Sequence, residues 1–145
     1  MSPDQPTIPA LTLWQPWACL VEIGAKPFDT RGFEIPKRLL GKRVAIHAAV
    51  RPCFVDFDQN TTDAITEAFG QCGWNYWLPR GVIVATTVLA ETIPVERVKA
   101  DPFGNYAPGR FAWRLQDVRP VRPHIAAKGR QQIGWDWTVP RGVNL

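Results

Sequence analysis

GVIVATTVLAETIPV, residues 81–95, is the longest run of β-branched residues in this 145-residue sequence. Valine, isoleucine and threonine favour extended backbone because their branched side chains pack well on a pleated surface. The first part of the run is almost continuously apolar, which is typical of a strand buried on both faces. The polar residues near its end indicate a strand that leaves the core. This stretch therefore predicts a buried strand with a polar end.

Apolar or alternating stretches on both sides of 81–95 predict further strands. Alternation in RFAWRLQDVRPV (110–121) places aromatic and apolar residues on one face and Arg110, Arg114 and Gln116 on the other. The remaining expected strands cover residues 10–13, 28–32, 43–49 and 134–140. Because these strands must pair over long sequence distances, the pattern favours an α+β, mainly β fold: a small β-barrel of about five or six strands with flanking helices.

Two helices are expected. In QPWACLVEIG (15–24), Pro16 suits the first helical position and Gly24 suits a left-handed C-terminal cap. The second helix is expected over 58–71, with Asn60 as its N-cap, and CGWNYWLPRG (72–81) is expected to be an aromatic loop. We expect residues 1–9 to be a flexible leader and 10–145 a single domain, with an aromatic-rich insert around 52–80.

Composition and charge narrow the functional classes. The N-terminus lacks the pattern of a signal peptide, and no apolar run reaches the roughly 20 residues that span a bilayer, so we expect a cytoplasmic protein with no membrane partner. Residues 51–109 carry four basic and seven acidic groups, whereas 110–145 carry seven and two. This asymmetry, together with seven tryptophans, favours RNA or another nucleic acid as partner, and a solubilising surface is the alternative.

The sequence lacks the residues that several kinds of catalytic site require. The three cysteines form no CxxC pair and there are only two histidines, so neither a metal site nor another cofactor site is expected. Ser2 is the only serine, and no phosphate-binding glycine loop is present. Cys19 and Cys72 are more typical of structural cysteines than of nucleophiles paired with His47.

One charged group near the N-terminus stands out. GAKPFDTR (24–31) follows the first expected helix and brings Lys26, Asp29 and Arg31 together. If this stretch is extended, Asp29 and Arg31 share a face, and a bend at Pro27 would bring Lys26 to the same pocket. Such a group can bind phosphate, orient a base edge or transfer a proton. The alternative is a solvated salt-bridge cluster of little energetic value.

LTLWQPWACLVEIGAKPFDTR, then RVAIHAA and later FAWRLQDVRPVRPHIAAKGRQQIGW, together resemble the ASCH (activating signal cointegrator homology) domain of the PUA-like superfamily. That family's hallmark is G-x-K-x-x-E-x-R after the first helix. Gly24, Lys26 and Arg31 match it, and Asp29 stands where Glu is usual. The resemblance covers most of residues 10–137 but covers the insert poorly. It implies a PUA-like barrel wrapped by helices, with the motif at the floor of a cleft.

The resemblance also implies RNA-related functions. Small deacetylating hydrolases that resemble this sequence use the motif lysine, a threonine at the position of Asp29, and a glutamate on a later strand. Here Thr30 is one place out of register, which should aim it at the opposite face, and GVIVATT contains no acid. Activity of that kind is therefore not the leading expectation.

The candidate site residues follow from these patterns. We expect Lys26, Asp29 and His47 to be the catalytic candidates, with a satisfied core histidine as the default for His47. Asp29 and Arg31 are also expected to form a pair that holds the shape of the cleft. Candidates for nucleic-acid contact are Lys26, Arg31, Trp14, Gln15, Arg110, Arg114, Lys128, Arg130 and Gln131.

Three hypotheses follow. The first is an ASCH-domain protein that binds RNA or a nucleotide in the cleft, with DNA as an alternative ligand. The second is an enzyme, either a metal-independent ribonuclease or an amidohydrolase acting on acetylated cytidine. The third is a protein-interaction module of the transcription-coactivator type, in which Trp74, Tyr76 and Trp77 of the insert form the contact surface with an unknown protein partner.

Overall fold

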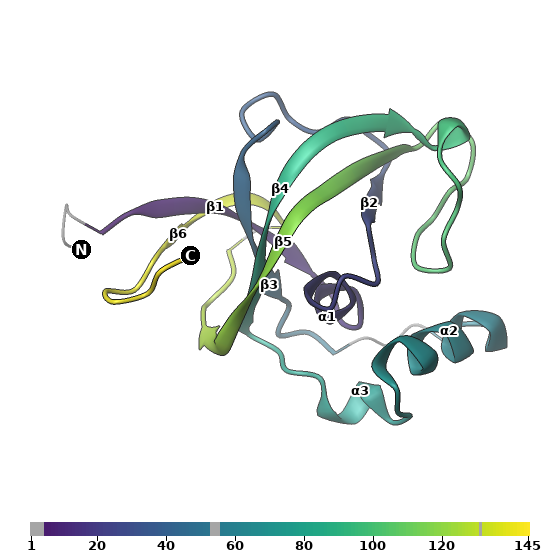
Figure 1. Ribbon diagram of the computed structural model, residues 1–145, viewed down its shortest axis with the longest axis horizontal. Coiled ribbons are helices and arrows are strands. Elements are labelled where there is room, and N and C mark those ends of the chain that lie inside the picture. Colours follow the sequence, from purple (N-terminus) through teal and green to yellow (C-terminus); the bar gives the residue numbers. More distant parts are fainter. Residues whose placement is uncertain (1–4, 53–55, 131) are drawn as a thin grey trace.

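The computed structural model describes residues 5–52, 56–130 and 132–145 (Figure 1). These residues form six strands in one mixed sheet and three short α-helices. The strands are β1 (Thr7–Leu13), β2 (Phe28–Arg31), β3 (Arg43–Ala48), β4 (Val82–Pro94), β5 (Phe111–Ala126) and β6 (Ile133–Thr138). The helices are α1 (Trp17–Glu22), α2 (Gln59–Phe69) and α3 (Trp74–Trp77), and a 3-10 turn covers Val95–Arg97.

The β-branched run at 81–95 forms the strand that the sequence predicts. β4 lies between β3 and β5 and pairs antiparallel with both. Ile83, Val84 and Ala85 are fully buried, whereas Glu91 near the other end is exposed. The buried strand with a polar end is therefore confirmed. Alternation in β5 is confirmed as well, because Trp113 and Leu115 are buried and Arg114 and Gln116 are exposed.

The sheet is open in its strand order. The order is β2-β5-β4-β3-β1-β6, and the pairings of the described residues do not join β2 to β6. β4 and β5 are long and strongly curved in Figure 1, and register shifts interrupt their pairing. Asp117 in β5 has a positive φ of 52°, which accompanies one of these irregularities. The fold is thus α+β and mainly β, as expected. The strand pairings of the described residues do not close the sheet into the expected barrel.

The start of β1 differs from our expectation of a flexible leader. The strand begins at Thr7, within the stretch 1–9 that we expected to be flexible, and residues 1–4 lie outside the described part of the chain. Thr7 and Ile8 pair with Thr138 and Trp137 of β6, and the later part of β1 pairs in parallel with β3. The first strand is therefore longer than its apolar stretch 10–13, because an edge partner far along the chain supplies the pairing.

Two apolar clusters cover the sheet. The larger contains Leu20 of α1, Ile46 of β3 and Trp113 of β5, and the smaller contains Ile83, Trp135 and Trp137. α1 starts at Trp17 with Pro16 at its N-cap and ends before Gly24, whose φ of 79° confirms the expected left-handed residue. Complete burial of large side chains such as Trp113 stabilises the fold by about 2–3 kcal/mol each.

The insert closes over one side of the larger cluster. α2 begins after Asp58, whose carboxylate accepts a 2.7 Å hydrogen bond from the Thr61 amide, so the expected Asn60 cap is wrong by two residues. The expected aromatic loop contains the short helix α3, and Trp74 is buried against Phe57. None of the described helices is long and apolar enough to cross a bilayer.

Candidate functional site

A cavity of about 540 Å³ lies beside the GAKPFDTR stretch. We call it the motif cavity, because Lys26, Asp29 and Arg31 all line it. Its other walls come from the end of β1, the start of α1, the start of α2 and residues 102–105. The three motif residues are therefore brought to one concave surface. This volume is within the range of small-ligand pockets.

Lys26 lies at the most protected part of the cavity. The residue is 4% exposed, its Nζ donates a hydrogen bond to the Phe103 carbonyl, and the Nζ lies 5.1 Å from the centre of the Trp17 ring. Burial lowers the pKa of Lys26 below its ordinary value; the carboxylates of Asp29 and Asp101 oppose this shift and Arg31 adds to it. The neutral form of the Lys26 amine is therefore more favoured in the folded protein than it would be in water.

Asp29 and Arg31 form the expected pair. Arg31 Nε donates to Asp29 Oδ2 at 2.9 Å, and both side chains are largely buried. The Arg31 guanidinium also lies 5.6 Å from the centre of the Trp113 ring. Because Trp113 is fully buried, Arg31 is held on one side by a packed ring and on the other by a carboxylate.

Thr30 also lines the motif cavity, contrary to the expectation that it faces away. β2 is an edge strand, and the segment that follows the 3-10 turn folds back over it. The Asn105 amide donates to Thr30 Oγ1 at 3.0 Å, and Arg110 Nη2 donates to the Thr30 carbonyl at 3.1 Å. The returning segment therefore encloses the strand, so consecutive residues of β2 contribute to one cavity.

Residues 101–106 form a wall that the sequence did not reveal. Asp101 accepts hydrogen bonds from the Phe103 amide (2.8 Å) and the Tyr106 hydroxyl (2.5 Å), and burial with this carboxylate raises the pKa of Tyr106. A Cβ on Gly104 would lie 2.9 Å from the Tyr106 ring and 3.1 Å from Thr30 Oγ1. The composition of DPFGN (101–105) is typical of a turn, but the return of this segment to β2 depends on long-range packing.

Aromatic residues form the other wall. Trp14 lines the cavity, as expected, together with Trp17 and Phe57, whose rings meet edge-on at 5.3 Å. Arg51, which we did not single out, places its guanidinium 5.4 Å from the centre of the Trp14 ring. An aromatic neighbour with a cationic group is suited to stacking on a planar ligand.

Gln15 and His47 lie away from the cavity. The Gln15 amide donates to the Pro79 carbonyl at 2.7 Å and accepts from the Cys19 amide at 3.1 Å, so it is committed within the fold. His47 is 1% exposed and contacts Thr12 Oγ1 at 3.1 Å and the Ala127 carbonyl at 2.8 Å. Burial lowers the pKa of His47, and its bond to Ala127 opposes this. Both side chains therefore make contacts within the fold, and neither is among the residues that line the motif cavity.

The structure does not bring the later candidates for nucleic-acid contact together. Arg110 lines the motif cavity, but Arg114, Lys128 and Arg130 are not among its lining residues. Arg114 instead pairs with Glu91 at 2.7 Å, on the solvent face, and Lys128 and Arg130 are exposed. Gln131 lies outside the described residues. The two arginines separate because Arg110 precedes β5 and bonds to the Asn105 and Thr30 carbonyls at 3.0 and 3.1 Å, whereas Arg114 lies within the strand and faces solvent.

Within the described ranges, no three His, Cys, Asp or Glu side chains are grouped to hold a metal ion. No protein-family model matches the chain, and no curated protein matches its sequence significantly. The ASCH resemblance therefore rests on the motifs themselves and stays a prediction.

Proposed function

We propose that this chain is an ASCH-type protein that binds RNA or a free nucleotide, with one base inside the motif cavity. On this proposal the six-stranded curved sheet is a variant of the PUA-like barrel. The single observation that carries the proposal is the combination of Lys26, Arg31 and Arg110 with aromatic walls in one cavity of about 540 Å³. A nucleotide needs both a surface for its flat base and cations for its phosphate.

The proposal gives each wall a role. Trp14 and Trp17 contact the faces of the base, and Lys26 and Asp29 hydrogen-bond its edge. Arg110, at the opening formed with Asn105, and Arg51, beside Trp14, contact phosphate. Arg31 keeps the Asp29 side chain oriented, because their 2.9 Å contact is largely shielded from water.

Calorimetric titration with cytidine monophosphate and a short single-stranded RNA tests this proposal, with the matching DNA as a comparison. Lys26→Met and Arg110→Gln each remove one charge from the cavity, and we expect each to weaken binding at least about tenfold. Arg114→Gln and Lys128→Gln remove the same charge outside it, and we expect less than about a twofold change. Equal weakening by all four variants would indicate diffuse attraction to phosphate and contradict the cavity assignment.

A second candidate function rests on the lowered pKa of Lys26 beside Asp29 and Asp101. A neutral amine in a sheltered cavity can accept a proton, so we propose amidohydrolase activity on acetylated cytidine as the alternative, with Lys26 as proton carrier. Ribonuclease activity is less favoured, because His47 lies outside the motif cavity. Acetate release by the wild type and not by Lys26→Met supports the alternative, and equal release by both contradicts it.

A further inference from the structure

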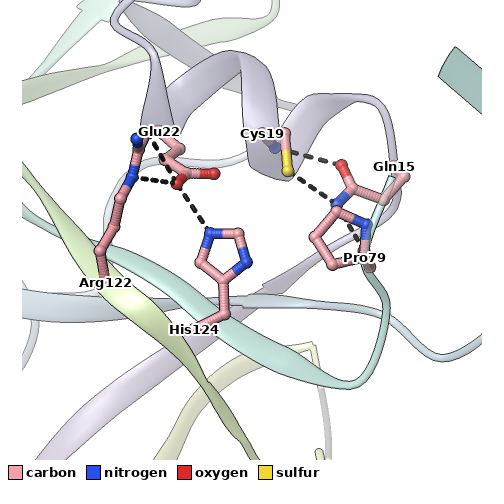
Figure 2. Close-up of polar contacts among 6 residues, drawn as sticks. All are labelled: Gln15, Cys19, Glu22, Pro79, Arg122 and His124. Carbon is pink, nitrogen blue, oxygen red and sulfur yellow. Dashed lines mark hydrogen bonds and ion pairs between the residues drawn. The ribbon is translucent and has the colours of Figure 1, made fainter. Parts of the chain in front are cut away.

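A second cavity, of about 580 Å³, lies between α1, the α2–α3 insert and residues 122–124 of β5. We call it the Glu22 cavity. One side is apolar and comes mainly from the insert: Ala68, Phe69, Trp77 and Leu78, with Ile23 at the end of α1. The other side is polar and holds Glu22, Arg122 and His124 (Figure 2). None of these residues is among those that line the motif cavity.

Glu22 is a carboxylate in an unusually sheltered place. The residue is 6% exposed, and its Oε2 contacts His124 Nε2 at 2.8 Å and Arg122 Nε and Nη2 at 3.3 Å each; a side-chain hydrogen bond with Glu22 is also among the influences that raise the pKa of Cys19. Figure 2 shows its other oxygen turned away from Arg122, toward the side of Cys19. A carboxylate can accept about four hydrogen bonds, so an incoming donor would take the place of one that Glu22 already has.

Arg122 is a loosely held partner for this carboxylate. Its side chain is 65% exposed, and both contacts are longer than the 2.7–2.9 Å of strong charged hydrogen bonds. Because this guanidinium is mostly in water, its departure leaves no buried cation, and an incoming cation keeps the buried Glu22 carboxylate paired. A second guanidinium can therefore replace Arg122 at Glu22 with little cost, while His124 keeps its contact.

The apolar wall and its charge surroundings fit the rest of such a ligand. Trp77 is 44% exposed, and its ring meets Phe69 edge-on at 5.5 Å, which leaves a partly open aromatic surface. α2, which carries Phe69, has Asp63 and Glu67 on its exposed side and no Lys or Arg in its 11 residues. α2 therefore carries negative side-chain charge and no positive side-chain charge, which favours a cationic partner at the wall that this helix contributes.

We infer that the Glu22 cavity binds an arginine side chain of a partner polypeptide. The aliphatic stem lies along Phe69 and Trp77, and the guanidinium replaces Arg122 at the Glu22 carboxylate. The site is a binding site and not a thiol-dependent catalytic site, because burial, the largest influence, raises the pKa of Cys19 to about 12 and keeps its thiol protonated.

Nuclear magnetic resonance titration of the full chain tests this inference. The probe is a blocked Gly-Arg-Gly peptide, and its control contains citrulline, which has the same shape without the charge. We expect the arginine peptide to shift the Trp77 indole signal saturably, and the citrulline peptide to bind at least about tenfold more weakly. Equal affinities for the two peptides, or no saturable shift of Trp77, would overturn the inference.

Two variants sharpen the test. Glu22→Gln keeps the shape of the side chain and should weaken binding of the arginine peptide at least about tenfold. Arg122→Ala removes the competing guanidinium and should tighten binding about threefold or more, a change that a merely disturbed fold would not produce. Weaker binding by Arg122→Ala, or preference for a glutamate-containing peptide, would assign recognition to Arg122 and overturn the inference.

Discussion

At the scale of single residues, Lys26 shows what a short motif predicts and what it leaves out. The spacing in GAKPFDTR predicted that Lys26, Asp29 and Arg31 share a pocket, and all three line the motif cavity. The motif did not reveal that Phe103 and Asp101 lie beside Lys26, because these residues are more than 70 positions away. The contacts of Gln15 and His47 were not foreseen for the same reason, since they are made with the distant carbonyl groups of Pro79 and Ala127.

The buried amine makes a testable contribution to stability. Because burial lowers the pKa of Lys26 from its ordinary 10.5, the unfolded chain binds more protons between the lowered value and 10.5. The wild type should therefore gain stability as pH rises through this window. Lys26→Met should be more stable than the wild type by about 1 kcal/mol at pH 7, and this difference should shrink toward pH 10.5.

Chemical denaturation over this pH range measures both stabilities. Lys42, an exposed lysine on the turn before β3, provides the control, because Lys42→Met should show no such pH-dependent difference. A difference in unfolding free energy between Lys26→Met and the wild type that grows with pH would contradict the claim that burial disfavours the charged form of Lys26.

At the scale of elements, regular patterns were predicted better than their ends. The β-branched run gave β4 and alternation gave β5, because both report burial through side-chain periodicity. The start of β1 at Thr7 was missed because its pairing with β6 is a property of two distant segments. α3 was missed because a four-residue helix has too few turns to show a period.

The loop between β5 and β6 is constrained at Gly129. A Cβ on this residue would lie 2.6 Å from His47 Cε1 and 2.9 Å from His47 Nδ1. His47 cannot move aside easily, because Thr12 and Ala127 hold both ring nitrogens. Gly129→Ala should therefore lower the free energy of unfolding by about 1–3 kcal/mol.

Gly32→Ala is the matched control, since its Cβ would meet only Arg110 Nη1 at 3.9 Å, and it should change stability by less than about 0.5 kcal/mol. Equal melting temperatures for the two variants would show that His47 is not fixed as described.

At the scale of the whole molecule, the motif cavity and the Glu22 cavity lie in different parts of the fold and have different lining residues. The motif cavity joins β1, α1, β2 and the segment before β5, so only the assembled fold creates it. The Glu22 cavity is formed where the insert meets α1 and β5. Sequence analysis predicted the mainly β class and identified the insert, but the open strand order and the separation of Arg114 from Arg110 depend on how the long strands curve and register.

The central claim is that a nucleotide base enters the motif cavity. The most direct measurement is a resonance-by-resonance titration of the isotopically labelled chain with cytidine monophosphate. The account predicts saturable shifts for the Trp14 and Trp17 indoles and for the amides of Lys26 and Asn105, with Trp77 unchanged. Shifts confined to Arg114, Lys128 and Arg130, with Trp14 and Lys26 silent at saturation, would contradict it.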